Sequence, residues 1–305
     1  MKGLDLKVKP QSGFTIVELI VVIVISGILS VVLIPLIVGP IDSYTDVSRR
    51  TRLVDIADSA MQKLAFDIKT ALPNSIRVGC GGQCVEFLRA PAGGRYRASP
   101  GNDGGAPVTD FLHFVTDTSF PVVGPLDFTG FATGTAGDCV NNNASCVVVY
   151  NTGLTGTDAW NGDNIATLAA GSSASTINFI NTDFVGGGSS FPSASPNQRF
   201  FLVDTPVKYV CNPTASTQLN PNGGSVLRYQ GFSFDPASWT VNSTPASTPA
   251  LLADHISGCS FRYDVGTDSR NAVLTIDITV SEFDSYSNVT EDVDLFQQVR
   301  VLNLP

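Results

Sequence analysis

The chain is poor in the residues that most catalytic and metal-binding sites use. It has 305 residues but only 2 histidines, His113 and His255, and neither has an evident partner in the sequence. So few imidazoles leave little material for histidine-based metal binding or acid–base chemistry. The sequence also lacks a nucleophile elbow, a phosphate-binding loop and a metal-binding histidine pair. We therefore expect no enzyme and no cofactor.

Positive charge is scarce as well. The chain has 18 Lys and Arg against 27 Asp and Glu, a formal net charge of −9. Nucleic-acid-binding proteins need a basic stripe, so we expect no nucleic-acid partner. What is abundant is apolar: 43% of the residues are hydrophobic and 18 are phenylalanine, which indicates a folded chain rather than a disordered one.

Six cysteines are present, an even number that fits an oxidising compartment. We expect three structural disulfides, Cys80–Cys84, Cys139–Cys146 and Cys211–Cys259. The first pair has C-x3-C spacing rather than the C-x2-C of redox motifs, and no second cysteine or histidine pair lies nearby to complete a zinc site. The last pair would close a loop of about 49 residues, which stabilises a fold by about 4 kcal/mol in the chain-entropy model.

The N-terminus carries the most specific pattern. Residues 1–13 form a short leader with three lysines and one aspartate, which keeps this end cytoplasmic. Residues 14–41 are apolar except for Glu18; as a helix they would span about 42 Å, more than the ~30 Å of a hydrocarbon core. We expect a single-pass transmembrane segment that stays with the mature protein, since no small-x-small cleavage site ends it. A plain signal anchor is the alternative, but it leaves Glu18 unexplained, because an unpaired carboxylate in hydrocarbon is costly.

The stretch GFTIVEL, Gly13 to Leu19, resembles the processing site of type IV prepilins and of type II secretion pseudopilins. The resemblance implies that a prepilin peptidase cuts between Gly13 and Phe14 and methylates the new terminus at Phe14. It also implies that Glu18 pairs with the terminal amine of a neighbouring subunit during assembly. Gly27 and Pro35 fall where such pilins often carry helix-weakening residues, so we expect the helix to unwind or bend there, with a further break at Gly39–Pro40.

After this segment the sequence becomes amphipathic and then β-rich. Apolar residues recur at three- and four-residue steps over 42–72, which predicts a helix half that lays one stripe on a head and stops before Pro73. Residues 73–305 should form that head, a loop-rich antiparallel β structure made of two sheets or of one sheet with elaborate loops. The predicted fold class is thus α+β. The strands are expected within 84–90, 111–116, 146–151, 199–204, 207–211, 260–265, 272–280 and 294–305.

One loop, DAWNGDN, groups Asp158, Asn161 and Asp163 around a glycine. Such oxygen-rich loops can hold calcium, but the spacing departs from the EF-hand pattern. We favour a solvated turn over a metal site.

The downstream half shows a narrower resemblance. Segments 199–211, 251–266 and 295–305 look like the O-type minor pilin of the mannose-sensitive haemagglutinin (MSHA) pilus, and the helix 49–73 looks like the J-type pseudopilins. This implies a minor pilin held in the inner membrane with a periplasmic head, and later carried to the pilus or cell surface. Its partners would be prepilin peptidase, an assembly ATPase, an inner-membrane platform, and other minor and major pilins. A type II secretion pseudopilin is the alternative, and a membrane-anchored periplasmic binding protein is a third.

Overall fold

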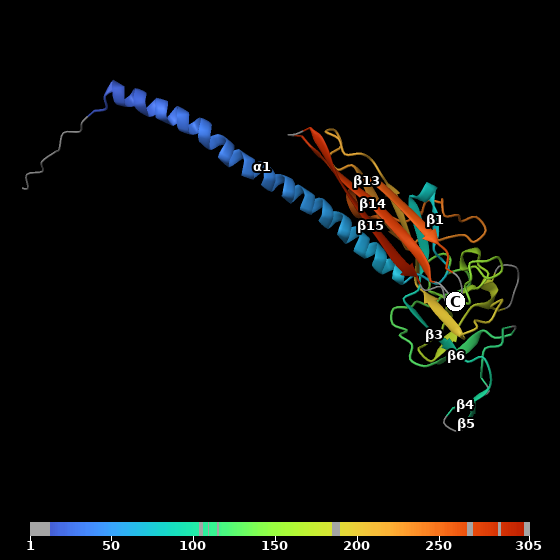
Figure 1. Cartoon of the computed structure of the whole chain (residues 1–305). Coiled ribbons are helices and arrows are strands. Elements are labelled where there is room, and N and C mark those ends of the chain that lie inside the picture. Colours follow the sequence, from blue (N-terminus) through green and yellow to red (C-terminus); the bar gives the residue numbers. More distant parts are fainter. Residues whose placement is uncertain are drawn as a thin grey trace, which may run out of the picture. The chain divides into compact units, whose positions relative to one another are not determined.

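The described part of the chain contains one long helix near its start, followed by antiparallel sheets (Figure 1). A computed structural model describes residues 13–103, 106–108, 110–114, 116–184, 190–266, 271–285 and 288–301. The chain divides into two compact units, residues 1–52 and 53–305. The predicted leader, apart from Gly13, lies outside the described residues.

Helix α1 spans Ile16–Lys69 without interruption, so it does not unwind at Gly27 or Pro35 and does not break at Gly39–Pro40, whereas the bend expected at Gly27 and Pro35 stays a prediction. An interior proline removes one backbone hydrogen bond, and the neighbouring turns of a long helix retain theirs. The helix also ends earlier than Leu72. Ala71 forms a bridge with Arg89, and the Leu72 N–H donates to the Leu88 carbonyl at 2.7 Å, so the sheet takes over the backbone at this point.

The last turns of α1 belong to the head unit and bury one stripe, as predicted. Every third or fourth side chain is buried against the main sheet, while Phe66 on the opposite side is 65% exposed. The buried members are Leu53, Ala57, Ala60, Met61, Leu64, Ala65 and Ile68. The predicted α+β class, with the N-terminal helix packed on a β head, is confirmed.

The main sheet has seven antiparallel strands in the order β1-β2-β11-β12-β13-β14-β15. Their bounds are Arg77–Gly79, Cys84–Arg89, Thr205–Asn212, Gly224–Gln230, Ala250–Asp264, Ala272–Asp284 and Val289–Val301. In β14 the alternate apolar side chains face the core, as the sequence predicted: Leu274, Ile276, Ile278 and Val280 are all fully buried. Figure 1 shows the long strands β13, β14 and β15 side by side.

A second sheet is built from residues that lie between β2 and β11 in the sequence. It has six antiparallel strands in the order β8-β7-β10-β3-β6-β9 and its own aromatic core, which includes Phe120, Phe179 and Phe200. The strand bounds are Ile165–Thr167, Cys146–Val149, Arg199–Val203, Ala92–Tyr96, Ser119–Val123 and Thr176–Asn178. We call residues 90–204 the inserted lobe. It also contains the β4–β5 hairpin (Gly101–Asp103 and Ala106–Val108). The described part of the head further contains the short 3₁₀ turns η1 (Cys80–Gly82), η2 (Ala159–Asn161) and η3 (Asn181–Asp183).

One predicted strand, 111–116, is wrong. The described residues of this stretch form turns, because the Asp117 carboxylate accepts a 2.7 Å hydrogen bond from the His113 N–H and the Asp117 N–H returns one to the His113 carbonyl. A local side-chain-to-backbone bond of this kind competes with strand pairing. The alternating apolar residues pack inward from an irregular segment instead, with Leu112 buried.

A cluster of charged side chains in the main sheet contacts the inserted lobe through Trp160. Glu86 of β2 is fully buried; Arg77 donates to its Oε1 at 2.6 Å, and the Lys208 ammonium lies 3.5 Å from its Oε2. The Arg77 guanidinium lies 4.2 Å from the ring centroid of Trp160, whose indole N–H donates to the Ser75 carbonyl at 2.7 Å. Paired and hydrogen-bonded charges of this kind can be buried without the full desolvation penalty.

Candidate assembly site at the start of the helix

The residues around the predicted processing site are exposed and only partly helical. Gly13, Phe14 and Thr15 precede the helix, and Phe14 is 81% exposed. The Gly13–Phe14 peptide bond therefore lies in a non-helical segment just before the first turn of α1. The bond is thus exposed and outside the helix, as cleavage by a peptidase requires.

Thr15 caps the helix. Its Oγ1 accepts a 3.3 Å hydrogen bond from the Glu18 backbone N–H, and its carbonyl accepts the first helical bond from Leu19. Thr15 and Glu18 thus occupy the first and last positions of the S/T-x-x-E capping-box pattern. Sequence reasoning missed this cap, although the T-x-x-E spacing is its signal.

Glu18 lies in the first turn of α1 and is exposed. A carboxylate here interacts favourably with the partial positive charge of the helix N-terminus. None of the residues that the structure describes forms an ion pair with Glu18. Its carboxylate is therefore available, within the described chain, for a cation of another molecule.

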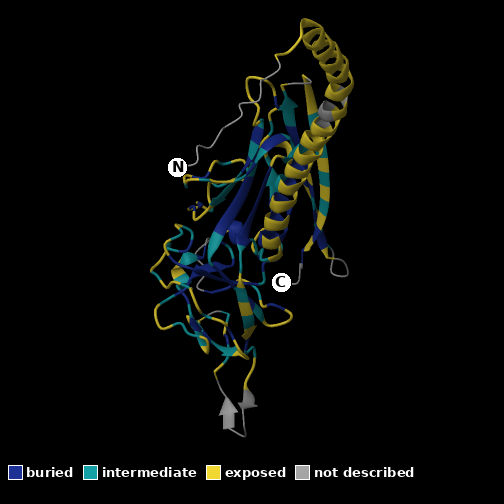
Figure 2. Ribbon diagram, turned by 90° about the vertical axis from the view of Figure 1, so that its left-hand side faces the viewer, coloured by how far each residue is buried: buried dark blue, intermediate teal, exposed yellow. Residues whose placement is uncertain are grey.

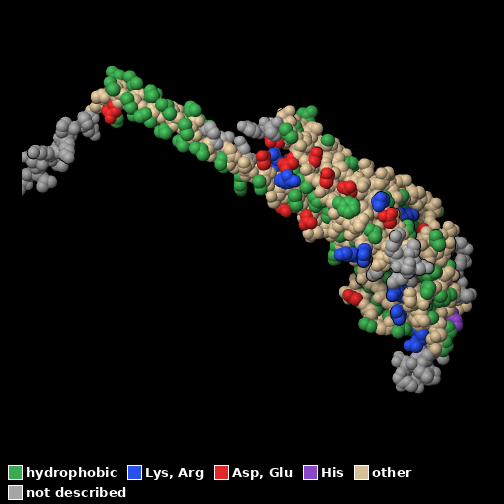
Figure 3. Space-filling view, in the orientation of Figure 1, with side chains coloured by type: hydrophobic (Ala, Val, Ile, Leu, Met, Phe, Trp, Pro, Cys, Tyr) green, Lys and Arg blue, Asp and Glu red, His purple; other side chains and the backbone are tan. Residues whose placement is uncertain are grey.

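The helix surface after Glu18 is apolar on every side. The large apolar side chains described between Phe14 and Leu36 are each between 48% and 81% exposed, and Figure 2 shows this part of α1 as exposed along its length. By length and composition, α1 is apolar enough to cross a membrane, and Figure 3 shows the hydrophobic side chains along it. A helix that is hydrophobic all round requires lipid or other apolar helices around it.

The head is closed by disulfides at each of the three expected pairs. The Cα–Cα distances are 5.4 Å for Cys80–Cys84, 5.2 Å for Cys139–Cys146 and 6.6 Å for Cys211–Cys259. Cys211 lies on β11 and Cys259 on β13, and β12 lies between these strands in the sheet order. The longest disulfide thus joins strands that are not hydrogen-bonded neighbours.

In the DAWNGDN segment, residues 158–164, the carboxylate oxygens accept hydrogen bonds from nearby backbone N–H groups. The Asp158 carboxylate accepts from the Trp160 N–H at 3.0 Å, and the Asp163 carboxylate accepts from the Gly156 and Asp158 N–H groups. Burial raises the pKa of the Asp158 carboxyl, opposed by that hydrogen bond and by the charge of Arg77. Asn161 donates its backbone N–H to the Asp158 carbonyl. These contacts build the 3₁₀ turn η2, in which Ala159 and Trp160 are buried, so the segment is a turn as predicted but not a solvated one.

In comparisons with known proteins, only the N-terminal part of the chain finds a match. The family model described as the prokaryotic N-terminal methylation motif matches residues 8–34, which include Gly13, Phe14 and Glu18. No curated protein and no solved structure matches the chain. The motif and the exposed apolar helix together indicate a type IV pilin-like prepilin, a class that includes the pseudopilins, and they are consistent with membrane anchoring and with processing by a prepilin peptidase.

Proposed function

We propose that the protein is a minor subunit of a type IV pilus or a related pseudopilus, with a structural and not a catalytic role. The observation that carries the proposal is the match of the methylation motif to a helix whose apolar side chains are exposed on all sides. Such a helix is stable only in lipid or among like helices, and a pilin passes from the first environment to the second as it is assembled.

The size of the head supports a minor role. The inserted lobe adds 115 residues between two neighbouring strands of the main sheet, and the added sheet has its own core. A subunit that repeats along a shaft must fit the same lattice on all sides, whereas a subunit at an end or at rare positions can carry a bulky addition. We accordingly propose that this subunit primes a filament, caps it, or is incorporated at scattered positions along it.

Within this class we propose the MSHA pilus as the system and the O-type minor pilin as the closest role. The support is the similarity of segments 199–211, 251–266 and 295–305 to that protein. The J-type pseudopilins are the second candidate, because the helix segment 49–73 resembles theirs. In either case the subunit would be inserted in the inner membrane with its head in the periplasm before assembly.

The test is quantitative mass spectrometry of filaments sheared from cells and purified, compared with cells that lack this chain. We expect the chain at a small fraction of the major subunit, and fewer filaments in the deletion strain. Its absence from the filaments together with normal piliation would contradict the proposal. Loss of protein secretion with normal piliation would favour the pseudopilin alternative.

A further inference from the structure

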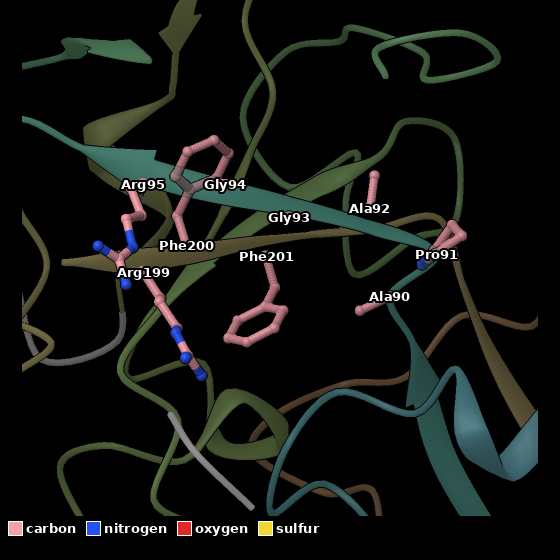
Figure 4. A pocket seen from close by; sticks show the side chains of 9 residues that line it. All are labelled: Ala90, Pro91, Ala92, Gly93, Gly94, Arg95, Arg199, Phe200 and Phe201. Carbon is pink, nitrogen blue, oxygen red and sulfur yellow. The ribbon is translucent and has the colours of Figure 1, made fainter. Parts of the chain in front are cut away.

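The inserted lobe carries an open groove on the outer face of its sheet, between β3 and β10 (Figure 4). The groove has a volume of about 380 Å³ and is lined by Ala90 to Arg95 and by Arg199 to Phe201. β3 and β10 are both interior strands, and β3 pairs with β6 only at Arg95 and Tyr96, so the groove offers a ligand side chains together with the backbone of Ala92 to Gly94.

Three consecutive cross-strand pairs form this surface: Arg95 faces Arg199, Gly94 faces Phe200, and Gly93 faces Phe201. The glycines are required by the rings. A Cβ on Gly94 would lie 2.9 Å from the Phe200 ring, and a Cβ on Gly93 would lie 2.7 Å from the Phe200 carbonyl oxygen and 3.1 Å from the Phe201 ring. Phe200 turns into the core of the lobe, whereas Phe201 lies on the groove side with both arginines (Figure 4).

The arginine pair is the unusual feature. Like charges directly opposite each other on antiparallel strands are destabilising, and a sheet normally avoids them. No described residue forms an ion pair or a hydrogen bond with the guanidinium group of Arg95 or Arg199, whereas the nearby Arg89 guanidinium lies 2.5 Å from the Asp204 carboxylate. In a chain of net charge −9, two unneutralised guanidinium groups side by side are not explained by the fold.

Two guanidinium groups beside a flat apolar wall are complementary to a ligand with one carboxylate and one ring. Arginine binds a carboxylate through two parallel hydrogen bonds, and the Phe201 ring with the glycine backbone leaves a side-chain-free surface for a ring to lie on. The volume admits one or two sugar-sized rings. We propose that this groove binds a carboxylate-bearing sugar, with Arg95 and Arg199 holding the carboxylate and Phe201 contacting the ring.

The proposal does not depend on the pilin role, because a single chain would bind the sugar.

The test is a titration of the full-length protein in detergent micelles by ligand-observed NMR, with D-glucuronate as the probe. D-glucose, which lacks the carboxylate, and acetate, which lacks the ring, are the matched probes. We expect glucuronate to bind, and D-glucose and acetate each to bind at least roughly tenfold more weakly than glucuronate. Acetate binding as tightly as glucuronate would overturn the assignment of a sugar.

The variants Arg95→Gln and Arg199→Gln should each weaken glucuronate binding roughly tenfold, as expected for loss of a charge-assisted hydrogen bond. Arg262→Gln is the matched control: it removes the same charge from an arginine on β13 whose side chain is 73% exposed, and it should leave binding unchanged. Thermal unfolding curves that match the wild type show that each variant is folded. Unchanged glucuronate binding in both groove variants would overturn the proposal. So would variants that bind glucuronate normally but are incorporated poorly into filaments, because Arg95 and Arg199 would then contact an acidic neighbouring subunit instead.

Discussion

The hydroxyl of Tyr209, on β11, donates a 2.7 Å hydrogen bond to Oδ2 of Asp67, near the end of α1 and 142 residues away in the sequence. The same carboxylate accepts from the Arg228 Nε at 2.7 Å and from the Lys63 ammonium at 2.9 Å. Asp67 is 1% exposed and Tyr209 is fully buried. This cluster fixes the end of the helix to the middle of the main sheet, so a force on α1 is transmitted to the head at a defined point.

Replacing this carboxylate should destabilise the head. Asp67→Asn keeps the shape but leaves Arg228 and the Tyr209 hydroxyl beside a neutral amide, and removing one partner of a buried charge pair costs about 3 kcal/mol. Urea unfolding of the full-length protein in detergent, followed by tryptophan fluorescence, measures this. Asp58→Asn, on the exposed side of α1, where Gln62 is its partner among the described residues, should change stability by less than about 0.5 kcal/mol. Equal effects of the two variants would contradict the role given to Asp67.

The same carboxylate predicts a pH dependence. Burial would raise the pKa of Asp67, but the hydrogen bonds from Lys63, Tyr209 and Arg228 outweigh it and hold the pKa below its usual value. A lowered folded-state pKa contributes stability that is complete above the unfolded-state pKa, near 4, and is lost as the pH falls through the folded-state pKa. The stability difference between wild type and Asp67→Asn should thus be constant from pH 7 to about 5 and shrink below about 4. A difference that grows on acidification would contradict this sign.

The disulfides should differ in their contribution. Removing Cys211–Cys259 as a double serine variant releases a loop of about 49 residues, and removing Cys80–Cys84 releases one of about five. The chain-entropy model gives about 4 and about 2 kcal/mol for these loops. Urea midpoints under non-reducing conditions compare them. Equal losses would show that closure of the longer loop is not the main contribution of Cys211–Cys259.

Much of the fold could be predicted because local patterns and tertiary packing agree. The stripe from Leu53 to Ile68 and the alternation from Leu274 to Val280 each have a single period, and each faces the core as expected. The two short disulfide pairs followed from proximity in sequence, and Cys211–Cys259 from the two cysteines that remained. The end of α1 could not be predicted to the residue, because it is set by Leu72 bonding to Leu88, a partner that local sequence does not specify.

The inserted lobe shows where sequence reasoning ends. Nothing in the local pattern of CVEFLR or TPVKYVCN indicates that these strands are neighbours with 115 residues between them. The Arg95–Arg199 pair depends on a strand register between segments about 100 residues apart, so only the structure brings it to light. The assembly site was readable because its residues are contiguous, from Gly13 to Glu18.

Glu18 can be tested separately from its helix-capping role. Glu18→Gln retains a residue that suits a capping box and removes the charge, so the helix and membrane insertion should be preserved. If the carboxylate pairs with the terminal ammonium of a neighbouring subunit, the variant should be recruited into filaments several-fold less than wild type. Thr15→Val is the converse control, since it removes the cap but keeps the charge. Quantitative immunoblots of purified filaments measure recruitment; wild-type levels of Glu18→Gln would show that the charge is not used for pairing.

The central claim, that this chain is processed and assembled as a pilin-like subunit, is tested most directly at its N-terminus. Cleavage after Gly13 would remove three lysines and one aspartate and change the formal charge from −9 to −11. Mass spectrometry of the N-terminal peptide from purified filaments should show a chain that begins at N-methylated Phe14. An assembled chain that still begins at Met1, or one cut at another bond, would contradict the account.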